Sequence, residues 1–109
     1  MTPEGKEKAK VKDFLATVRV SCLTRPAPEA VGYYHMAVPM GYGSSTLDFT
    51  GCYRGRFFAI ETKAHDTDDL SPRQKIMRDQ IEMAGGMVFW GCADRVISEA
   101  NIWFRALDK

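Results

Sequence analysis

Two acidic residues and a lysine near the middle of the chain have a spacing that suits metal-ion chemistry. Residues 47–63 (LDFTGCYRGRFFAIETK) predict a β-hairpin, because two short apolar-rich runs flank Arg54-Gly55. A two-residue or a four-residue loop gives one register, in which Asp48 faces Glu61. Facing Cβ atoms lie about 4.5–5.5 Å apart, so the two carboxylates repel each other unless a cation binds between them. Strand alternation places Lys63 on the same face as Glu61.

The register depends on the length of the loop at the hairpin tip. An odd-length loop would shift the pairing by one residue and move Asp48 to the opposite face. A two-residue loop also requires a positive φ at Arg54, which the favoured hairpin turns usually assign to Asn, Asp or Gly. The competing interpretation is a surface hairpin whose charges are solvated, and the residues alone leave it open.

The spacing Asp-(x12)-Glu-x-Lys resembles the motif of the PD-(D/E)XK nucleases. The surrounding sequence is similar to the VRR-NUC domains (virus-type replication-repair nucleases), especially the small stand-alone phage members. The matching pieces follow the order of the family and are TPEGKEKAKVKDFL, PMGYGSSTLDF, RGRFFAIETKA, LSPRQ and AGGMVFWG. The family often has Pro or Gly before the motif aspartate, whereas Ser45-Thr46-Leu47 precedes Asp48 here. This departure concerns the shape of the loop, since the aspartate itself is present.

The resemblance implies metal-dependent hydrolysis of phosphodiester bonds in DNA. Asp48, Glu61 and the backbone carbonyl of Thr62 are then the expected ligands of Mg²⁺ or Mn²⁺. Glu4 is expected to complete the site, either directly or through water. Lys63 is expected to orient or activate the attacking water and to stabilise charge on the phosphate.

A first helix is predicted to begin at Pro3 and to run to about residue 18. Thr2 suits the N-cap and Pro3 suits the first helical position. Its apolar stripe consists of Val11, Phe14, Leu15 and Val18. Extended backward by seven residues, the stripe places Glu4 at the edge of the buried face, although a carboxylate there also suits the helix dipole. Glu7 is the competitor for the metal site, and the TPEG match favours Glu4.

A second helix is predicted over residues 72–84, with Ser71 as its N-cap. Gln74 is placed to close a capping box, and the resemblance gives this glutamine a second role next to the metal site. The helix is expected to bury Met77, Ile81 and Ala84 before it ends at the following glycines. Strand 56–63, helix 72–84 and strand 87–90 then form a βαβ unit. The segment 64–70 contains His65 and three aspartates, but their spacing fits no known ligand loop, so a solvated loop is predicted there rather than a metal site.

The remaining segments complete an α/β prediction. Residues 21–32 read as a loop, 33–38 as a strand and 39–46 as a glycine-containing loop in which Tyr42 could stack on a base. Asp94 could cap a final helix with an apolar side of Val96, Ile97, Ala100, Trp103, Phe104 and Leu107. The predicted fold is α/β, a small mixed four-stranded sheet flanked by helices, and the resemblance implies that it is PD-(D/E)XK nuclease-like.

The composition indicates one folded domain, residues 1–109, with 45% hydrophobic and 11% aromatic residues. No apolar run approaches the roughly 18–20 residues that would span a membrane, and no apolar leader is visible. The three cysteines are odd in number and lack metal-ligand spacing. We therefore expect reduced thiols and a cytoplasmic location, which is the host cytoplasm if a phage encodes the chain.

The resemblance implies DNA as the partner, duplex or branched, such as a four-way junction. A net charge of +1 is no signature of nucleic-acid binding, so phosphate contacts would come from local clusters of lysine and arginine. The apolar final helix predicts a homodimer or higher homo-oligomer, although that helix could equally close the core of one chain. The alternatives in function are a non-catalytic nucleic-acid-binding or regulatory module on the same scaffold, and a nuclease that acts on RNA.

Overall fold

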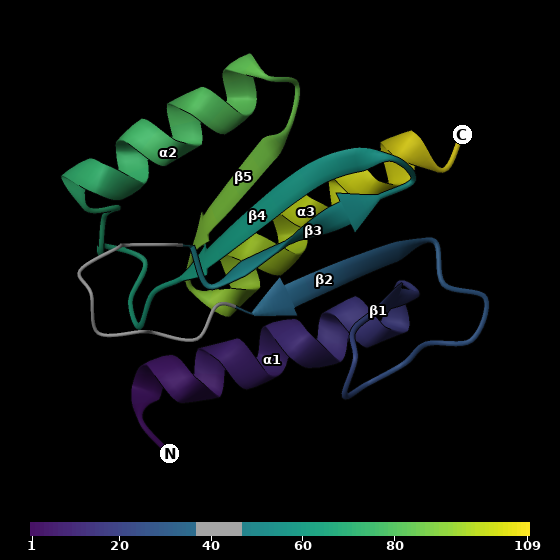
Figure 1. Ribbon diagram of the computed structural model, residues 1–109. Helices are drawn as coiled ribbons and strands as arrows, with labels where there is room; N and C mark the ends of the chain where they lie inside the picture. The colour runs from purple at the N-terminus through teal and green to yellow at the C-terminus, as the bar shows by residue number, and fades with distance from the viewer. Residues whose placement is uncertain (37–46) are drawn as a thin grey trace.

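The computed structural model describes residues 1–36 and 47–109, which form a mixed α/β fold (Figure 1). In chain order the elements are α1 (Pro3–Thr17), β1 (Val20–Ser21), β2 (Gly32–Met36), β3 (Phe49–Tyr53), β4 (Arg56–Thr62), α2 (Pro72–Met83), β5 (Met87–Gly91) and α3 (Ala93–Leu107). The strands form one sheet in the order β1-β2-β3-β4-β5. The outer pairs β1–β2 and β4–β5 are parallel, and the inner pairs are antiparallel. The predicted parallel crossover from β4 through α2 to β5 is therefore confirmed.

Helices cover both faces of the sheet, because side chains alternate along its strands. On β4, Phe58 and Ile60 point into the larger core, which α1 and α3 close. Ala59 points the other way and packs with Met77 and Ile81 of α2. Figure 1 shows α2 apart from α1 and α3, on the opposite side of the sheet. This alternation directs Glu61 to the same face as α2.

The hairpin has the register that the sequence predicts. Cys52 pairs with Phe57 and Thr50 pairs with Ala59. The two-residue turn is possible because Arg54 adopts a positive φ of 47° and Gly55 one of 84°. Asp108 supports this turn from beyond α3, since its carboxylate pairs with the Arg54 guanidinium and accepts a hydrogen bond from the Tyr53 hydroxyl.

The sheet has five strands, so the prediction of four strands is wrong. The additional strand, β1, ends at the first residue of the stretch predicted as a loop and pairs with the beginning of β2. Val20 drives this pairing because its side chain is completely buried in the larger core. The backbone reverses at Arg19, whose φ is 63°, and Val31 donates a hydrogen bond to the Arg19 carbonyl. A two-residue strand is too short to show an alternating pattern in the sequence.

Two details of the helices also differ from the sequence-based predictions. Ala84, which was predicted to be buried, is exposed and is the C-cap at which α2 ends. Cys92, rather than Asp94, is the N-cap of α3, and Asp94 lies in the first turn. The N-caps of the other two helices, Thr2 and Ser71, are those that the sequence predicts.

The apolar side of α3 is used within the chain. Val96, Ala100 and Phe104 are buried, and Phe104 stacks on Tyr53 with 4.2 Å between the ring centroids. The other predicted apolar residues of this helix, Ile97, Trp103 and Leu107, also pack against the larger core. The face that suggested a dimer therefore closes the core of one chain, as the alternative interpretation held.

Some expectations concern residues outside the described part of the chain. The last residues of the strand predicted over 33–38, and the loop over 39–46 with Tyr42, lie there. Among the helices that are described, none is both long and apolar enough to cross a membrane.

Candidate metal centre

Carboxylates from three elements meet at one end of the sheet. Glu4 comes from the first turn of α1, Asp48 directly precedes β3, and Glu61 lies near the end of β4. Each offers a carboxylate oxygen, and these oxygens all lie within 4.8 Å of one another. Oxygen donors of this kind suit hard divalent cations such as Mg²⁺ and Mn²⁺. The structure thus brings together the three acidic residues that the sequence analysis selected.

Asp48 is held in place by the strand opposite it. Its Oδ2 accepts hydrogen bonds from the Thr62 backbone N–H at 3.0 Å and from the Thr62 hydroxyl at 2.6 Å. In return, the Asp48 backbone N–H donates to Oε1 of Glu61 at 3.0 Å. Thr62, which provides this anchor, is completely buried. The sequence analysis named the Thr62 carbonyl as a ligand, which stays a prediction, and missed the role of its hydroxyl.

Glu61 is the most deeply placed carboxylate of the centre, with only 5% of its surface exposed. Burial, as the largest cause, and the negative charge of Asp48 together raise the pKa of its carboxyl from 4.5 to about 6. Lys63 and the hydrogen bonds from Asp48 and Gln74 act in the opposite direction. A bound cation would stabilise the ionised form of Glu61, and so would offset the effects of burial and of the Asp48 charge on its pKa.

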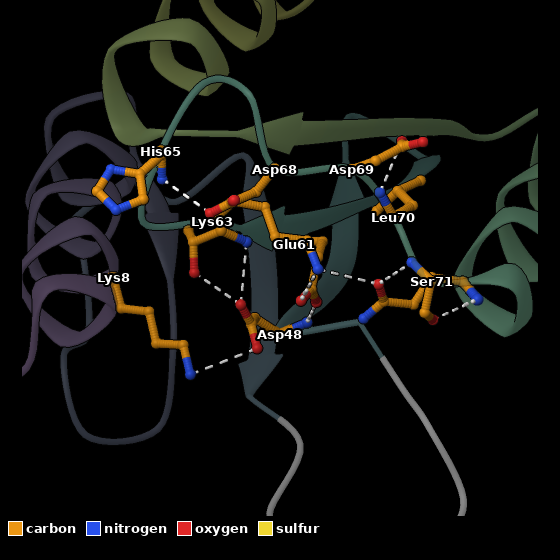
Figure 2. A network of polar contacts seen from close by, with 11 residues as sticks. Lys8, Asp48, Glu61, Lys63, His65, Asp68, Asp69, Leu70 and Ser71 are labelled. Atoms are coloured by element: carbon orange, nitrogen blue, oxygen red, sulfur yellow. Dashed lines mark hydrogen bonds and ion pairs between the residues drawn. The ribbon is translucent and has the colours of Figure 1, made fainter.

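Lys63 and Gln74 lie beside Glu61, as Figure 2 shows for the lysine. The Lys63 ammonium is 3.6 Å from Oε2 of Glu61 and donates a hydrogen bond to Oε1 of Gln74 at 3.2 Å. The same Gln74 oxygen accepts from the Ser71 backbone N–H, which closes the predicted capping box of α2. Capping the helix and holding the lysine are therefore two roles of one side-chain oxygen.

The structure separates the two glutamates that competed for the α1 position. Glu7 points to the start of α3, where its Oε1 accepts a hydrogen bond from the Ala93 backbone N–H at 3.0 Å. This bond is the main reason that the pKa of Glu7 lies below its ordinary value. Lys10 forms an ion pair with the other Glu7 oxygen. Glu4, and not Glu7, therefore belongs to the carboxylate cluster.

Lys8 is a member of the site that the sequence analysis missed. Its ammonium lies 3.5 Å from Oδ1 of Asp48, and Figure 2 shows the side chain reaching from α1 to that carboxylate. A signal was available, because Lys8 follows Glu4 by four residues and so shares its face of the helix. That signal becomes specific only when α1 is known to cross the end of the hairpin.

The acidic loop after β4 does not join the centre. His65 and Asp68 are hydrogen-bonded to each other, Asp69 pairs with Lys75, and Asp66 accepts a hydrogen bond from the Cys92 thiol. Within residues 1–36 and 47–109, the only acidic, histidine or cysteine cluster suited to a metal ion is the one at Glu4, Asp48 and Glu61.

Comparison of the chain with protein-family models, with curated proteins and with solved structures finds no match. The resemblance to VRR-NUC domains therefore stays a prediction that the motifs carry.

Proposed function

We propose that the chain is a metal-dependent nuclease that hydrolyses phosphodiester bonds in DNA. The observation that carries this proposal is the convergence of Glu4, Asp48 and Glu61 within 4.8 Å, with the Lys63 ammonium 3.6 Å from Glu61. Carboxylates that stabilised only the fold would be kept apart, because like charges on facing strands are unfavourable. A binding site for a divalent cation accounts for their arrangement.

The donor set fits Mg²⁺ or Mn²⁺, since all three side chains offer oxygen and, within residues 1–36 and 47–109, no histidine or cysteine joins the cluster. Glu4, Asp48 and Glu61 would hold the ion. Bound there, it would supply a Lewis acid that activates water and stabilises charge on a phosphate. The protein supplies the orientation, because Thr62 fixes Asp48 through two hydrogen bonds.

Lys63 is placed to act on the reacting groups. Its ammonium can donate hydrogen bonds to a water molecule or to a phosphate oxygen next to the carboxylates. Gln74 keeps that ammonium near Glu61 through the 3.2 Å hydrogen bond. In this proposal Lys63 is a catalytic residue, whereas Gln74 and Thr62 are positioning residues.

The substrate and the family belong to the same proposal. The order of the VRR-NUC-like motifs supports DNA, and the small stand-alone members of that family suggest branched DNA such as a four-way junction. RNA remains a competing substrate. The rival class is a non-catalytic nucleic-acid-binding module, which is favoured by one observation: Lys8 and Lys63 already neutralise part of the acidic charge.

The decisive experiment is a cleavage panel with Mn²⁺ that includes duplex, nicked, flapped and four-way-junction DNA, and an RNA duplex. We expect cleavage of at least one DNA substrate, with loss of activity in Asp48→Ala, Glu61→Ala and Lys63→Ala. Glu82→Ala, which removes an exposed carboxylate from α2, is the matched control and should cleave normally. Full activity in Asp48→Ala or Glu61→Ala would exclude the proposed centre. Salt-sensitive DNA binding without any stabilisation of the protein by Mn²⁺ would favour the binding module.

A further inference from the structure

The two oxygens of Asp48 have different partners. Thr62 occupies Oδ2 with two hydrogen bonds, so Oδ1 is the oxygen left for a cation. In this structure Oδ1 faces the ammonium of Lys8 at 3.5 Å. Lys8 therefore occupies one of the positions from which a metal ion would be coordinated.

The two lysines of the centre are held differently. Lys63 is tied to Gln74 as well as to Glu61, and its side chain is only 18% exposed. Lys8 is 34% exposed, and among the described residues its ammonium has Asp48 as its only ion-pair or hydrogen-bond partner. Its long, unbranched side chain can move into solvent without breaking any other contact described. Lys8 is thus the lysine whose ammonium can move away from the carboxylates.

The charges of the centre favour this exchange. The formal charges of the three carboxylates and the two ammonium groups sum to one negative charge. A divalent cation added with both lysines in place would reverse that charge, whereas a cation that replaces Lys8 brings the centre to neutrality. Repulsion between the ion and the Lys8 ammonium acts at short range in a partly desolvated site, where screening is weak.

We propose that Lys8 is an internal counter-ion that a divalent cation displaces from Asp48. This inference rests on the proposed metal centre. It adds an explanation of how the carboxylates are stabilised when the ion is absent. The lysine lowers the repulsion among the carboxylates in the metal-free protein and competes with the metal for Oδ1. Once displaced, the ammonium is free at the mouth of the site on α1.

The test is calorimetric titration of Mn²⁺ into the metal-free protein without DNA. Lys8→Met removes the competitor, and we expect its dissociation constant for Mn²⁺ to be about two- to fivefold lower than that of the wild type. Lys8→Arg should bind Mn²⁺ more weakly than the wild type, because a guanidinium pairs with a carboxylate in a bidentate manner. Lys6→Met removes the same charge from an exposed position on the same helix and should leave the affinity unchanged.

The outcomes separate this inference from the proposed function. Binding of Mn²⁺ by the wild type, with equal or weaker binding by Lys8→Met, would overturn the exchange and leave the metal centre standing. A similar gain of affinity in Lys6→Met would also overturn it, because the effect would then come from general charge. Absence of Mn²⁺ binding in the wild type and in Lys8→Met would overturn both the centre and the exchange.

Discussion

The proton on Glu61 links the stability of the metal-free protein to pH. The pKa of Glu61 is about 6 in the folded chain, against an ordinary value of 4.5. At a pH between these two values, Glu61 is mostly protonated in the folded chain and mostly ionised in the unfolded chain. The folded state is therefore favoured at low pH, and this contribution disappears as the pH rises through that window. The shift corresponds to about 2 kcal/mol.

We expect urea unfolding with EDTA to show this loss when wild type and Glu61→Gln are compared at about pH 4.5 and about pH 7.5. Glutamine has the size of the acid but does not titrate, so the variant should lack the decrease and gain relative stability at the higher pH. Identical pH dependence of the two proteins would show that Glu61 titrates normally.

The hydroxyl of Thr62 should contribute more to stability and to Mn²⁺ binding than the volume of its side chain does. Thr62→Val keeps the volume but leaves Asp48 Oδ2 with only the backbone N–H at 3.0 Å. We expect a loss of about 1.5–3 kcal/mol in the free energy of unfolding, the usual range for a hydrogen bond to a charged group, together with weaker Mn²⁺ binding. Thr62→Ser keeps the hydroxyl and should bind Mn²⁺ like the wild type. Equal Mn²⁺ affinities for the valine and serine variants would contradict a positioning role.

Among the site residues, the sequence predicted the positions that depend on strand alternation, but it missed a contact that depends on packing between distant segments. Asp48 and Glu61 come together because the hairpin register is local, and Lys63 follows from alternation along β4. Lys8 could not be assigned in the same way. Its contact with Asp48 exists only because α1 crosses the end of the hairpin, and no local pattern records that crossing.

Among the elements, α1 carries two glutamates, Glu4 and Glu7, with separate tasks. Glu7 accepts a hydrogen bond from the backbone at the start of α3, where the side chain of the N-cap residue Cys92 forms no capping hydrogen bond. We expect Glu7→Ala to lower the free energy of unfolding by about 1 kcal/mol, as for other N-terminal caps, without abolishing Mn²⁺ binding. Glu4→Ala should do the reverse, with little change in stability and weaker Mn²⁺ binding.

Chemical unfolding and Mn²⁺ titration of the two variants provide the measurement. Glu7→Gln is the conservative control, because its amide oxygen can still accept from the Ala93 N–H, and its loss should be smaller than that of alanine. Loss of Mn²⁺ binding in Glu7→Ala, with normal binding in Glu4→Ala, would reverse the assignment.

The elements themselves could be predicted where their signals are local. The N-caps Thr2 and Ser71 each precede a proline, which marks the start of a helix clearly. The strand β1 could not be predicted, because its two residues gain stability only from pairing with β2 beyond a long intervening segment. Asp94 was misassigned as a cap because the residue that satisfies the start of α3 is Glu7, far away in the sequence.

For the whole molecule, the proposed homodimer needs a surface other than the buried side of α3. Large apolar side chains are exposed on α2, where Ile76 is 58% exposed and Met83 is 89% exposed. We expect light scattering at micromolar concentration to give twice the mass of one 12.3 kDa chain. We expect this exposed face of α2 to form the contact between two chains. Met83→Glu should then reduce the mass to one chain, because it places a charge in that apolar contact.

Ile102→Glu is the matched control, since Ile102 is 69% exposed but lies on α3. It should leave the mass unchanged. A wild-type mass of one chain, combined with paired cuts in a four-way junction, would show that the dimer is not needed for such cutting.

The hydrogen bond from Ala93 to Glu7 has a consequence for synthesis of the chain. All the proposed site residues lie between positions 4 and 74, but α1 packs against α3, which begins at residue 93. As the chain leaves the ribosome, the hairpin can pair early, whereas α1 has no α3 to pack against until residues 93–107 have followed. A chain interrupted before α3 would therefore contain every proposed ligand of the centre, while the helix that carries Glu4 lacked its contacts with α3. The ability to bind the ion would arrive late in translation, after the whole hydrophobic core is in place.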